Sequence, residues 1–435
     1  MRMRRVAIGV LLMVVQSAIA TQSDPPANDQ SANTGETPRI ELLLPSPLTD
    51  AQWKSTLEAL NLGARADLAE AFASYQSGWS DLSKALGELA KDSENAARTK
   101  DTVEQAAAID AVFKRSGRVI DQAASLDNNL FAALAAAGGE PQALDVQRLQ
   151  GELQRAQAYT ALARMPIWTE CTVDVAKVVE QLSAQGVDLS AIKDLVAARS
   201  LADTPTIQST ARLCREVLVK DQTIMLQYKA LADTPGSEAA ANDLMEQRQR
   251  LWRRVVSAAK TLKSANQGLV VALVQSLPES QAALLRETFD ERWHPRIYGQ
   301  KKNLRLMFLK AKEIEGNSKE YSELADNLER EFVTRFDVVA NKSVRAEDDW
   351  IERRLQQQPI TRTDMDDYRR SVLALTAERN DVGNDAWAKL LAPLPPEKRT
   401  VLQNWMSPTA GQKPASKSGS SKPVGRGGAG DLLVK

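Results

Sequence analysis

The stretch from Leu251 to Ala272 reads LWRRVVSAAKTLKSANQGLVVA and decides the fold class. Seven of its residues follow one another at steps of 4, 3, 4, 3, 4 and 3: Leu251, Val255, Ala258, Leu262, Ala265, Leu269 and Ala272. This heptad spacing puts them on one edge of a helix. Alanine at every second position lets two helix axes approach to about 8 Å. We therefore predict a tight helical hairpin or coiled coil whose alanine edge is buried within the chain or, as the alternative, in a homodimer.

Helical periodicity continues from residue 41 to 406, and helix breaks interrupt it without any strand alternation. Two breaks are near copies, Leu201–Pro205 and Leu231–Pro235, both reading LADTP. In each, threonine can cap the next helix and proline can occupy its first turn. The prediction is an all-α fold, an elongated multi-helix bundle or two helical lobes. So long a helical region exceeds what one compact core usually serves, so we place an N-terminal lobe at 41–235 and a C-terminal lobe at 236–406.

The composition excludes several classes of function. The 435 residues carry 56 basic and 56 acidic side chains, so a net charge of zero gives no reason to expect nucleic-acid binding. One histidine and two cysteines are too few for a usual zinc site or for multi-histidine catalysis. Phosphate-binding glycine loops and nucleophile elbows are also lacking. We therefore expect no cofactor, no metal and no enzymatic activity.

Residues 1–20 are typical of an export signal. Arg2, Arg4 and Arg5 precede an apolar run from Val6 to Val15, and Ala18 and Ala20 form a small-x-small cleavage site. The run is about half of the ~20 residues that a transmembrane helix needs, and no later run approaches that length. The expected protein is exported, periplasmic or extracellular, with no membrane span after cleavage.

Both ends of the mature chain are predicted to be disordered. Residues 21–40 form a polar leader with too few apolar side chains to fold. Residues 407–435 form a tail in which fourteen of 29 residues are Gly, Ser or Pro, and five are basic against one acid. That tail either increases solubility or contacts an anionic envelope surface.

Cys171 and Cys214 are predicted to form a disulfide. Each shares an apolar stripe at helical spacing, so both sulfurs should face the core. An intervening helix near 188–201 would make the two cysteine-bearing helices parallel neighbours, and export supplies an oxidising compartment. The Cα atoms should then lie about 4.4–6.8 Å apart. Two buried free thiols are the alternative.

The segment Leu48-Thr49-Asp50-Ala51-Gln52 has the form Leu-Thr-x-x-Gln. It resembles a motif of the small helical periplasmic proteins related to Spy and CpxP, in which an all-helical, cradle-like dimer acts in envelope stress and Spy binds unfolded clients. The resemblance covers five residues and implies a chaperone-like function. The same residues are also a helix-capping signature that any helical protein can use.

A basic segment is the candidate anion or partner contact. Between residues 292 and 312 seven basic side chains occur without an acid: Arg292, Arg296, Lys301, Lys302, Arg305, Lys310 and Lys312. Interleaved aromatic residues would suit a phosphate, a lipid headgroup or an acidic client. Residues 313–331, however, carry seven acids against two bases. Two adjacent blocks of opposite sign can instead neutralise one another.

Three further features have a structural interpretation. His294 lies between Trp293 and Pro295, where we expect a helix break and a structural role, although a lone histidine can also respond to pH. Asp364-Met-Asp366-Asp367 is similar to the acidic run of helical terpene cyclases, but it follows threonines at a predicted helix start. Residues 347–349, Glu-Asp-Asp, are expected on a solvated face.

Together these patterns predict an exported, non-enzymatic helical interaction protein, a scaffold or chaperone-like binder of the cell envelope. An anion-binding module that uses the basic segment is the first alternative. An enzyme with a carboxylate-based site at the Asp364 run is the second. The partner, an unknown protein or envelope component, does not follow from the sequence.

Overall fold

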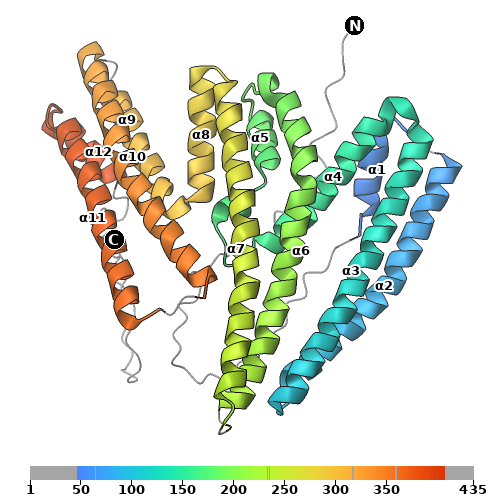
Figure 1. The fold of residues 1–435 in the computed structure, drawn as a ribbon. Helices are drawn as coiled ribbons and strands as arrows, with labels where there is room; N and C mark the ends of the chain where they lie inside the picture. The colour runs from blue at the N-terminus through green and yellow to red at the C-terminus, as the bar shows by residue number, and fades with distance from the viewer. Residues whose placement is uncertain are drawn as a thin grey trace, which may run out of the picture. The chain divides into compact units, whose positions relative to one another are not determined.

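The computed structural model describes residues 47–63, 65–232, 234, 236–315, 318–357 and 360–406. Within these ranges the chain forms α-helices and short 3-10 turns but no strand, which confirms the all-α prediction (Figure 1). The predicted export signal, the leader and the basic tail lie outside the described residues. No described helix is both long and apolar enough to cross a bilayer.

Contacts divide the chain into two units. Unit 1 comprises Met1–Gly299 and Asn341–Ala374, and unit 2 comprises Gln300–Ala340 and Leu375–Lys435. The predicted lobe boundary at residues 235 and 236 falls at the turn between two helices of unit 1. The elements in chain order are α1 (Asp50–Ala59), α2 (Ala66–Arg98), α3 (Thr102–Gly138), α4 (Glu140–Leu162), η2 (Thr169–Cys171), α5 (Val175–Ala184), η3 (Ser190–Ile192), α6 (Lys193–Ala232), α7 (Glu238–Gln275), α8 (Glu279–Trp293), α9 (Pro295–Glu315), α10 (Lys319–Leu355), α11 (Arg362–Leu391) and α12 (Pro396–Met406).

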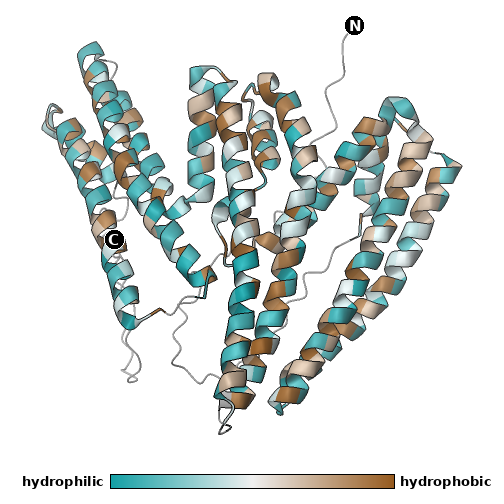
Figure 2. Ribbon diagram, viewed as in Figure 1, coloured by the Kyte–Doolittle hydropathy of each residue, from teal (hydrophilic) through white to brown (hydrophobic). Residues whose placement is uncertain are grey.

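An aromatic cluster packs α1 against α2 in unit 1. Trp53 of α1 stacks on Phe72 of α2, with ring centroids 4.7 Å apart and planes 4° from parallel. Tyr75 and Trp79 extend the cluster along α2. These α2 residues recur every three or four positions, so they share one helix face, and that face is buried against α3. Figure 2 shows apolar residues along one side of these helices and polar residues along the other.

Helices α6 and α7 form the central hairpin of unit 1, and here the predicted seam is only partly correct. Val255, Leu262 and Leu269 are buried as expected. Ala258, Ala265 and Ala272 are only half-buried, so the predicted burial of the alanine edge is incomplete. The buried positions one residue further along are Ala259, Asn266 and Leu273. One residue is a rotation of about 100°, and α7 is turned this way because η2 and α8 pack on it as well as α6.

The two LADTP copies behave differently. Helix α6 continues through Pro205, so the first predicted break is wrong. The main-chain carbonyl of Ser200 accepts hydrogen bonds from the Thr204 hydroxyl at 2.7 Å and from Arg155 Nη1 at 3.1 Å. Both contacts fall on the residue before Leu201, whose carbonyl is the one that loses its helix donor at Pro205. In the second copy Leu231 and Ala232 end α6, and Gly236, which follows the copy, has a φ of +83° before α7 begins at Glu238.

Unit 2 is held by its own aromatic core. Phe332 of α10 lies between Phe308 of α9 and Phe336, with ring-centroid distances of 5.8 and 5.5 Å. The Tyr321 hydroxyl donates a hydrogen bond of 2.9 Å to the carbonyl of Leu390 in α11. Apolar packing of three helices thus defines this unit.

The disulfide prediction is wrong. Cys171 and Cys214 are both buried, as predicted, but they are free thiols and are not close enough to bond. Cys171 belongs to the turn η2, and the predicted helix near 188–201 is not a separate element, because residues from Lys193 onward already belong to α6, which carries Cys214. The Cys171 thiol lies 3.1 Å from the carbonyl of Ala259 instead. Burial raises the pKa of the Cys171 thiol and raises that of Cys214 to about 12, so neither is a reactive thiolate.

Candidate functional site

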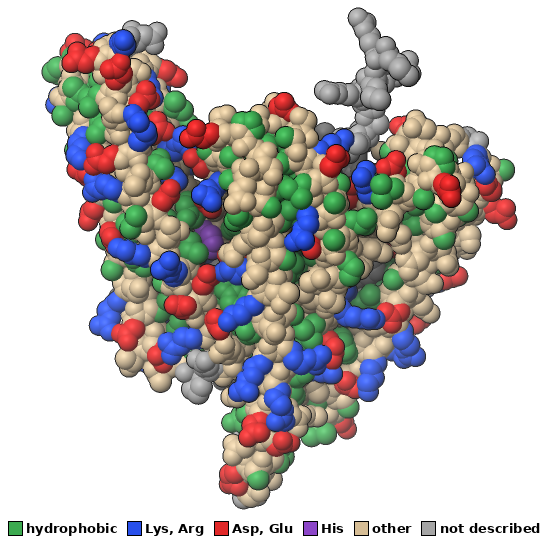
Figure 3. All heavy atoms as spheres, turned by 45° about the horizontal axis from the view of Figure 1, so that its top comes forward, with side chains coloured by type: hydrophobic (Ala, Val, Ile, Leu, Met, Phe, Trp, Pro, Cys, Tyr) green, Lys and Arg blue, Asp and Glu red, His purple; other side chains and the backbone are tan. Residues whose placement is uncertain are grey.

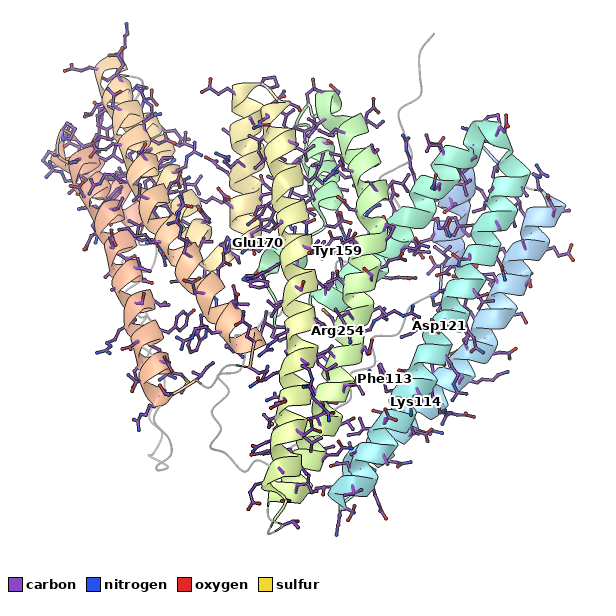
Figure 4. All side chains as sticks on the ribbon, in the orientation of Figure 1. Phe113, Lys114, Asp121, Tyr159, Glu170 and Arg254 are labelled. Atoms are coloured by element: carbon purple, nitrogen blue, oxygen red, sulfur yellow. The ribbon has the colours of Figure 1, made fainter. Side chains whose placement is uncertain are left out.

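A charged cluster around one buried carboxylate joins four parts of unit 1. We call it the Glu170 cluster, and its members are Glu170 of η2, Lys263 of α7, His294 between α8 and α9, and Glu347 and Asp348 of α10. Figure 4 labels Glu170 near the middle of α7. Charged side chains are seldom buried unless they are paired, so such a cluster is the first place to look for function.

Local sequence positions the histidine. Helix α8 ends at Trp293, and the main-chain N–H of His294 donates to the carbonyl of Asp290 at 2.9 Å. Pro295 then opens α9, where its missing N–H costs no helix hydrogen bond. The predicted helix break at this point is confirmed. It leaves His294 at a corner, from which its ring reaches both η2 and α10.

Glu170 lies at the centre of the cluster, with a relative exposure of 1%. Its Oε1 atom is 2.9 Å from Lys263 Nζ, 3.3 Å from Gln267 Nε2 and 3.5 Å from His294 Nε2. Its Oε2 atom is buried and has no hydrogen-bond partner among the described residues. All the positive charge that offsets this carboxylate therefore acts through one oxygen.

Two acids of α10 complete the cluster from the other side. Glu347 Oε2 is 3.7 Å from His294 Nδ1, and Asp348 Oδ1 is 2.6 Å from Lys263 Nζ. The Lys263 ammonium also lies 5.4 Å from the centre of the Trp168 ring. His294 and Lys263 each bridge Glu170 to α10, so the two cations link η2 to that helix.

The electrostatics of the cluster fix its charge state near neutral pH. Burial alone would raise the pKa of Glu170, but contacts with His294 and Lys263 outweigh it and lower the pKa to about 2. Burial alone would lower the pKa of His294, but contacts with Glu170 and Glu347 raise it to about 9. Both groups are thus ionised at neutral pH. Neither has a pKa near 7, which a general acid or base needs.

A second polar group lies between α4, α5 and α6. Arg155 is 5% exposed and contacts Asp174, the N-cap of α5, with 3.7 Å between Nε and Oδ2. Burial and the neighbouring carboxylate of Glu152 raise the pKa of Glu180, which follows on α5, to about 7. Among the described residues, no group of three or more His, Cys, Asp or Glu side chains is arranged to hold a metal ion.

The predicted basic segment is largely neutralised by neighbouring side chains. Within unit 2, Lys301 pairs with Asp337 at 2.7 Å, Arg305 with Glu329 at 2.8 Å, and Lys312 with Asp326. Lys310 pairs with Glu313 at 2.6 Å. Within unit 1, Arg292 donates to Gln181 Oε1 at 2.9 Å. Arg296 and Lys302 also have interactions, so none of the seven residues is free. This arrangement favours internal pairing over an anion site.

The Asp364 run is a helix start. Asp364 accepts hydrogen bonds from the main-chain N–H and the hydroxyl of Thr361, at 2.9 and 2.7 Å, and pairs with Arg353 at 2.9 Å. These contacts lower the pKa of Asp364 to about 2. Asp366 and Asp367 are exposed. A proton donor would need a raised pKa in a pocket, so this geometry does not favour the carboxylate-based enzyme.

The prediction of a solvated face for residues 347–349 is only partly correct, because Glu347 and Asp348 are half-buried. Glu347 and Asp348 turn towards His294 and Lys263, whereas Asp349 is exposed. Sequence reasoning also missed Glu170 and Lys263. The available signal was polar residues within the heptad pattern of α7, where Asn266 occupies a core position and donates to the carbonyl of Glu170 at 2.6 Å.

The Leu48–Gln52 segment forms a capping box at the start of α1. The Thr49 hydroxyl accepts from the N–H of Gln52 at 3.3 Å, and Gln52 Oε1 accepts from the N–H of Thr49 at 2.9 Å. Leu48 is buried, and its N–H donates to the Tyr75 hydroxyl at 2.9 Å. The motif therefore has a complete structural explanation as a cap.

Comparison with known protein families, with curated proteins and with solved structures finds no match to this chain.

Proposed function

We propose that the protein is an exported, non-enzymatic helical binder that holds apolar segments of other envelope proteins, as a scaffold or chaperone. The ionisable groups of the Glu170 cluster are paired with one another, and the pKa values of Glu170 and His294, about 2 and about 9, lie far from 7, so the pair does not favour acid-base catalysis. Binding must then use the outer surface of the helices. On the face in Figure 3, basic and acidic side chains are interspersed, which does not favour a large anionic partner.

The observation that carries the proposal is an outward apolar pair on each of two helices of unit 2. Leu306 and Leu309 of α9 are 44% and 53% exposed and lie three residues apart. Val401 and Trp405 of α12 are 54% and 41% exposed and lie four residues apart. Each spacing places both side chains on one helix face. Large apolar side chains that face solvent together are the usual contacts for apolar segments of a partner.

The test is suppression of client aggregation by the full-length protein at a one-to-one ratio. We expect wild type to suppress aggregation and the double variant Leu306→Ser, Leu309→Ser to lose most of that effect. The matched control is Val338→Ser on α10, which is 56% exposed and should behave as wild type. A wild-type protein without effect, or a double variant that is fully effective, would contradict the proposal.

Export has a separate test. The N-terminal sequence of the protein recovered from its native host should begin at Thr21. Recovery with an intact Met1 in the cytoplasmic fraction would contradict export and leave the binding test unaffected.

A further inference from the structure

The contacts of the last part of α10 with α7 and η2 are unusually rich in charge. Glu347, Asp348 and Glu352 meet His294, Lys263 and Lys260, and the Glu352 to Lys260 distance is 2.6 Å. Ile351 and Leu355 provide apolar contacts to the same core. The attachment of this segment therefore depends on the charge state of the side chains that it contacts. Attachment by apolar packing alone would depend on charge much less.

We propose that the Glu170 cluster is a charge latch: protonated His294 holds residues 341–355 of α10 against α7 and η2, and deprotonation of His294 releases that segment. This is a regulatory device within unit 1. It does not depend on the proposed binding function, because it concerns a different part of the chain.

The number of charges in the cluster explains why the loss of a single proton can release the segment. The groups that face His294 from the elements around it are Glu170 of η2, Lys263 of α7, Tyr298 of α9, and Glu347 and Asp348 of α10. Among the cluster members alone, three carboxylates face two cations while His294 is protonated, which leaves one negative charge in excess within the cluster. Arg296, in the first turn of α9, has its own interaction and lies outside this count. Loss of the proton doubles that excess in a site where the Glu170 carboxylate is almost fully buried. The mutual repulsion of the three acids then favours separation of α10 from η2.

The position of the unpaired oxygen adds to this effect. Glu170 Oε2 has no hydrogen bond among the described residues. When protonated His294 no longer stabilises the carboxylate through Oε1, no described donor at Oε2 compensates for that loss. Lys263 remains, but it already serves both Glu170 and Asp348. The cluster thus has no spare cation among its members.

The experiment is hydrogen exchange of the full-length protein, read by mass spectrometry at pH 6.5 and pH 10 and corrected for the intrinsic rate at each pH. The protection factors of peptides from residues 341–355 should fall at least tenfold at pH 10. The protection factors of peptides from α2 should not change. His294→Gln should show the low protection of 341–355 already at pH 6.5. Glu347→Gln, which removes the ion pair of α10 with His294 and keeps the histidine, should do the same.

Glu352→Gln is the matched control, because Glu352 also pairs α10 with α7 but does not contact His294. It should keep the pH response of wild type. Equal protection of 341–355 at both pH values in wild type would overturn the latch. A loss of protection that spreads equally over α2 would overturn it too, because that pattern is global unfolding. Should His294→Gln fail to fold, the wild-type pH series and Glu347→Gln still decide the question.

Discussion

The aromatic cluster of α1 and α2 and the Glu170 cluster solve the same problem with opposite chemistry. Each fixes a short segment to long helices of unit 1: Trp53 stacks α1 on α2, and Glu170 ties η2 to α7. Stacked rings are held by dispersion and water exclusion, which change little between pH 5 and 10. Ion pairs depend on every partner keeping its charge. The comparison teaches that two regions of one molecule that attach segments in the same way can differ in their sensitivity to pH.

The largest expected effect tests the apolar side of the comparison. Phe72→Ala removes the ring that stacks on Trp53 and leaves a cavity, so the free energy of unfolding should fall by about 3–5 kcal/mol. Urea denaturation measures it. The loss should be equal at pH 6.5 and pH 9. A loss under 1 kcal/mol would show that the stack does not stabilise α1 on α2.

The next effect tests the charged side. Glu170→Gln keeps the shape of the side chain but removes the charge that offsets Lys263 and His294, so we expect a loss of about 2–3 kcal/mol at pH 6.5. Denaturation at several pH values provides the measurement. In contrast to Phe72→Ala, the loss should shrink as pH rises. A pH-independent loss would mean that His294 is not charged in the folded protein.

The wild-type protein should be most stable at mildly acidic pH. The pKa of His294 rises from 6.5 to about 9 on folding, so its contribution is complete below pH 6.5 and is lost as pH rises through 9. The raised pKa of Glu180 acts in the same direction but in a lower window, because its contribution is lost mainly between its ordinary pKa of 4.5 and its folded pKa of about 7. We expect a fall of about 2 kcal/mol between pH 6.5 and pH 9.5. Rising stability over this range in thermal melts would refute the assignment.

A smaller effect concerns the start of α1. Thr49→Ala removes one half of the capping box and should cost about 1 kcal/mol. Thr49→Ser, which keeps the hydroxyl, is the matched control and should cost less. Equal losses would show that the hydroxyl does not cap the helix.

The smallest effect is expected from reduction. Cys171 and Cys214 are free, so a thiol reductant should leave the melting temperature of the native protein unchanged. Titration of the denatured protein without reductant should find two sulfhydryl groups. A drop in melting temperature on reduction would instead indicate a disulfide.

The sequence predicts the two regions unequally well. Helix spacing and the Thr49 cap identify α1 and α2, because a periodic apolar face and a local hydrogen bond are encoded by neighbouring residues. The Glu170 cluster could not be predicted, since its members lie at residues 170, 263, 294 and 347–348 and meet only through tertiary packing. Pro205 shows that a local signal can also predict a break that the fold does not contain. Helix α6 continues through Pro205, although local rules predict a break there.

The central claim is that Glu170 and protonated His294 stabilise one another inside unit 1, and a double-mutant cycle tests it directly. Unfolding free energies would be measured for wild type, Glu170→Gln, His294→Gln and the double variant, at pH 6.5 and pH 10. We predict a coupling of about 2 kcal/mol at pH 6.5 that falls close to zero at pH 10. A coupling below about 0.5 kcal/mol at pH 6.5, or one of equal size at both pH values, would contradict the account.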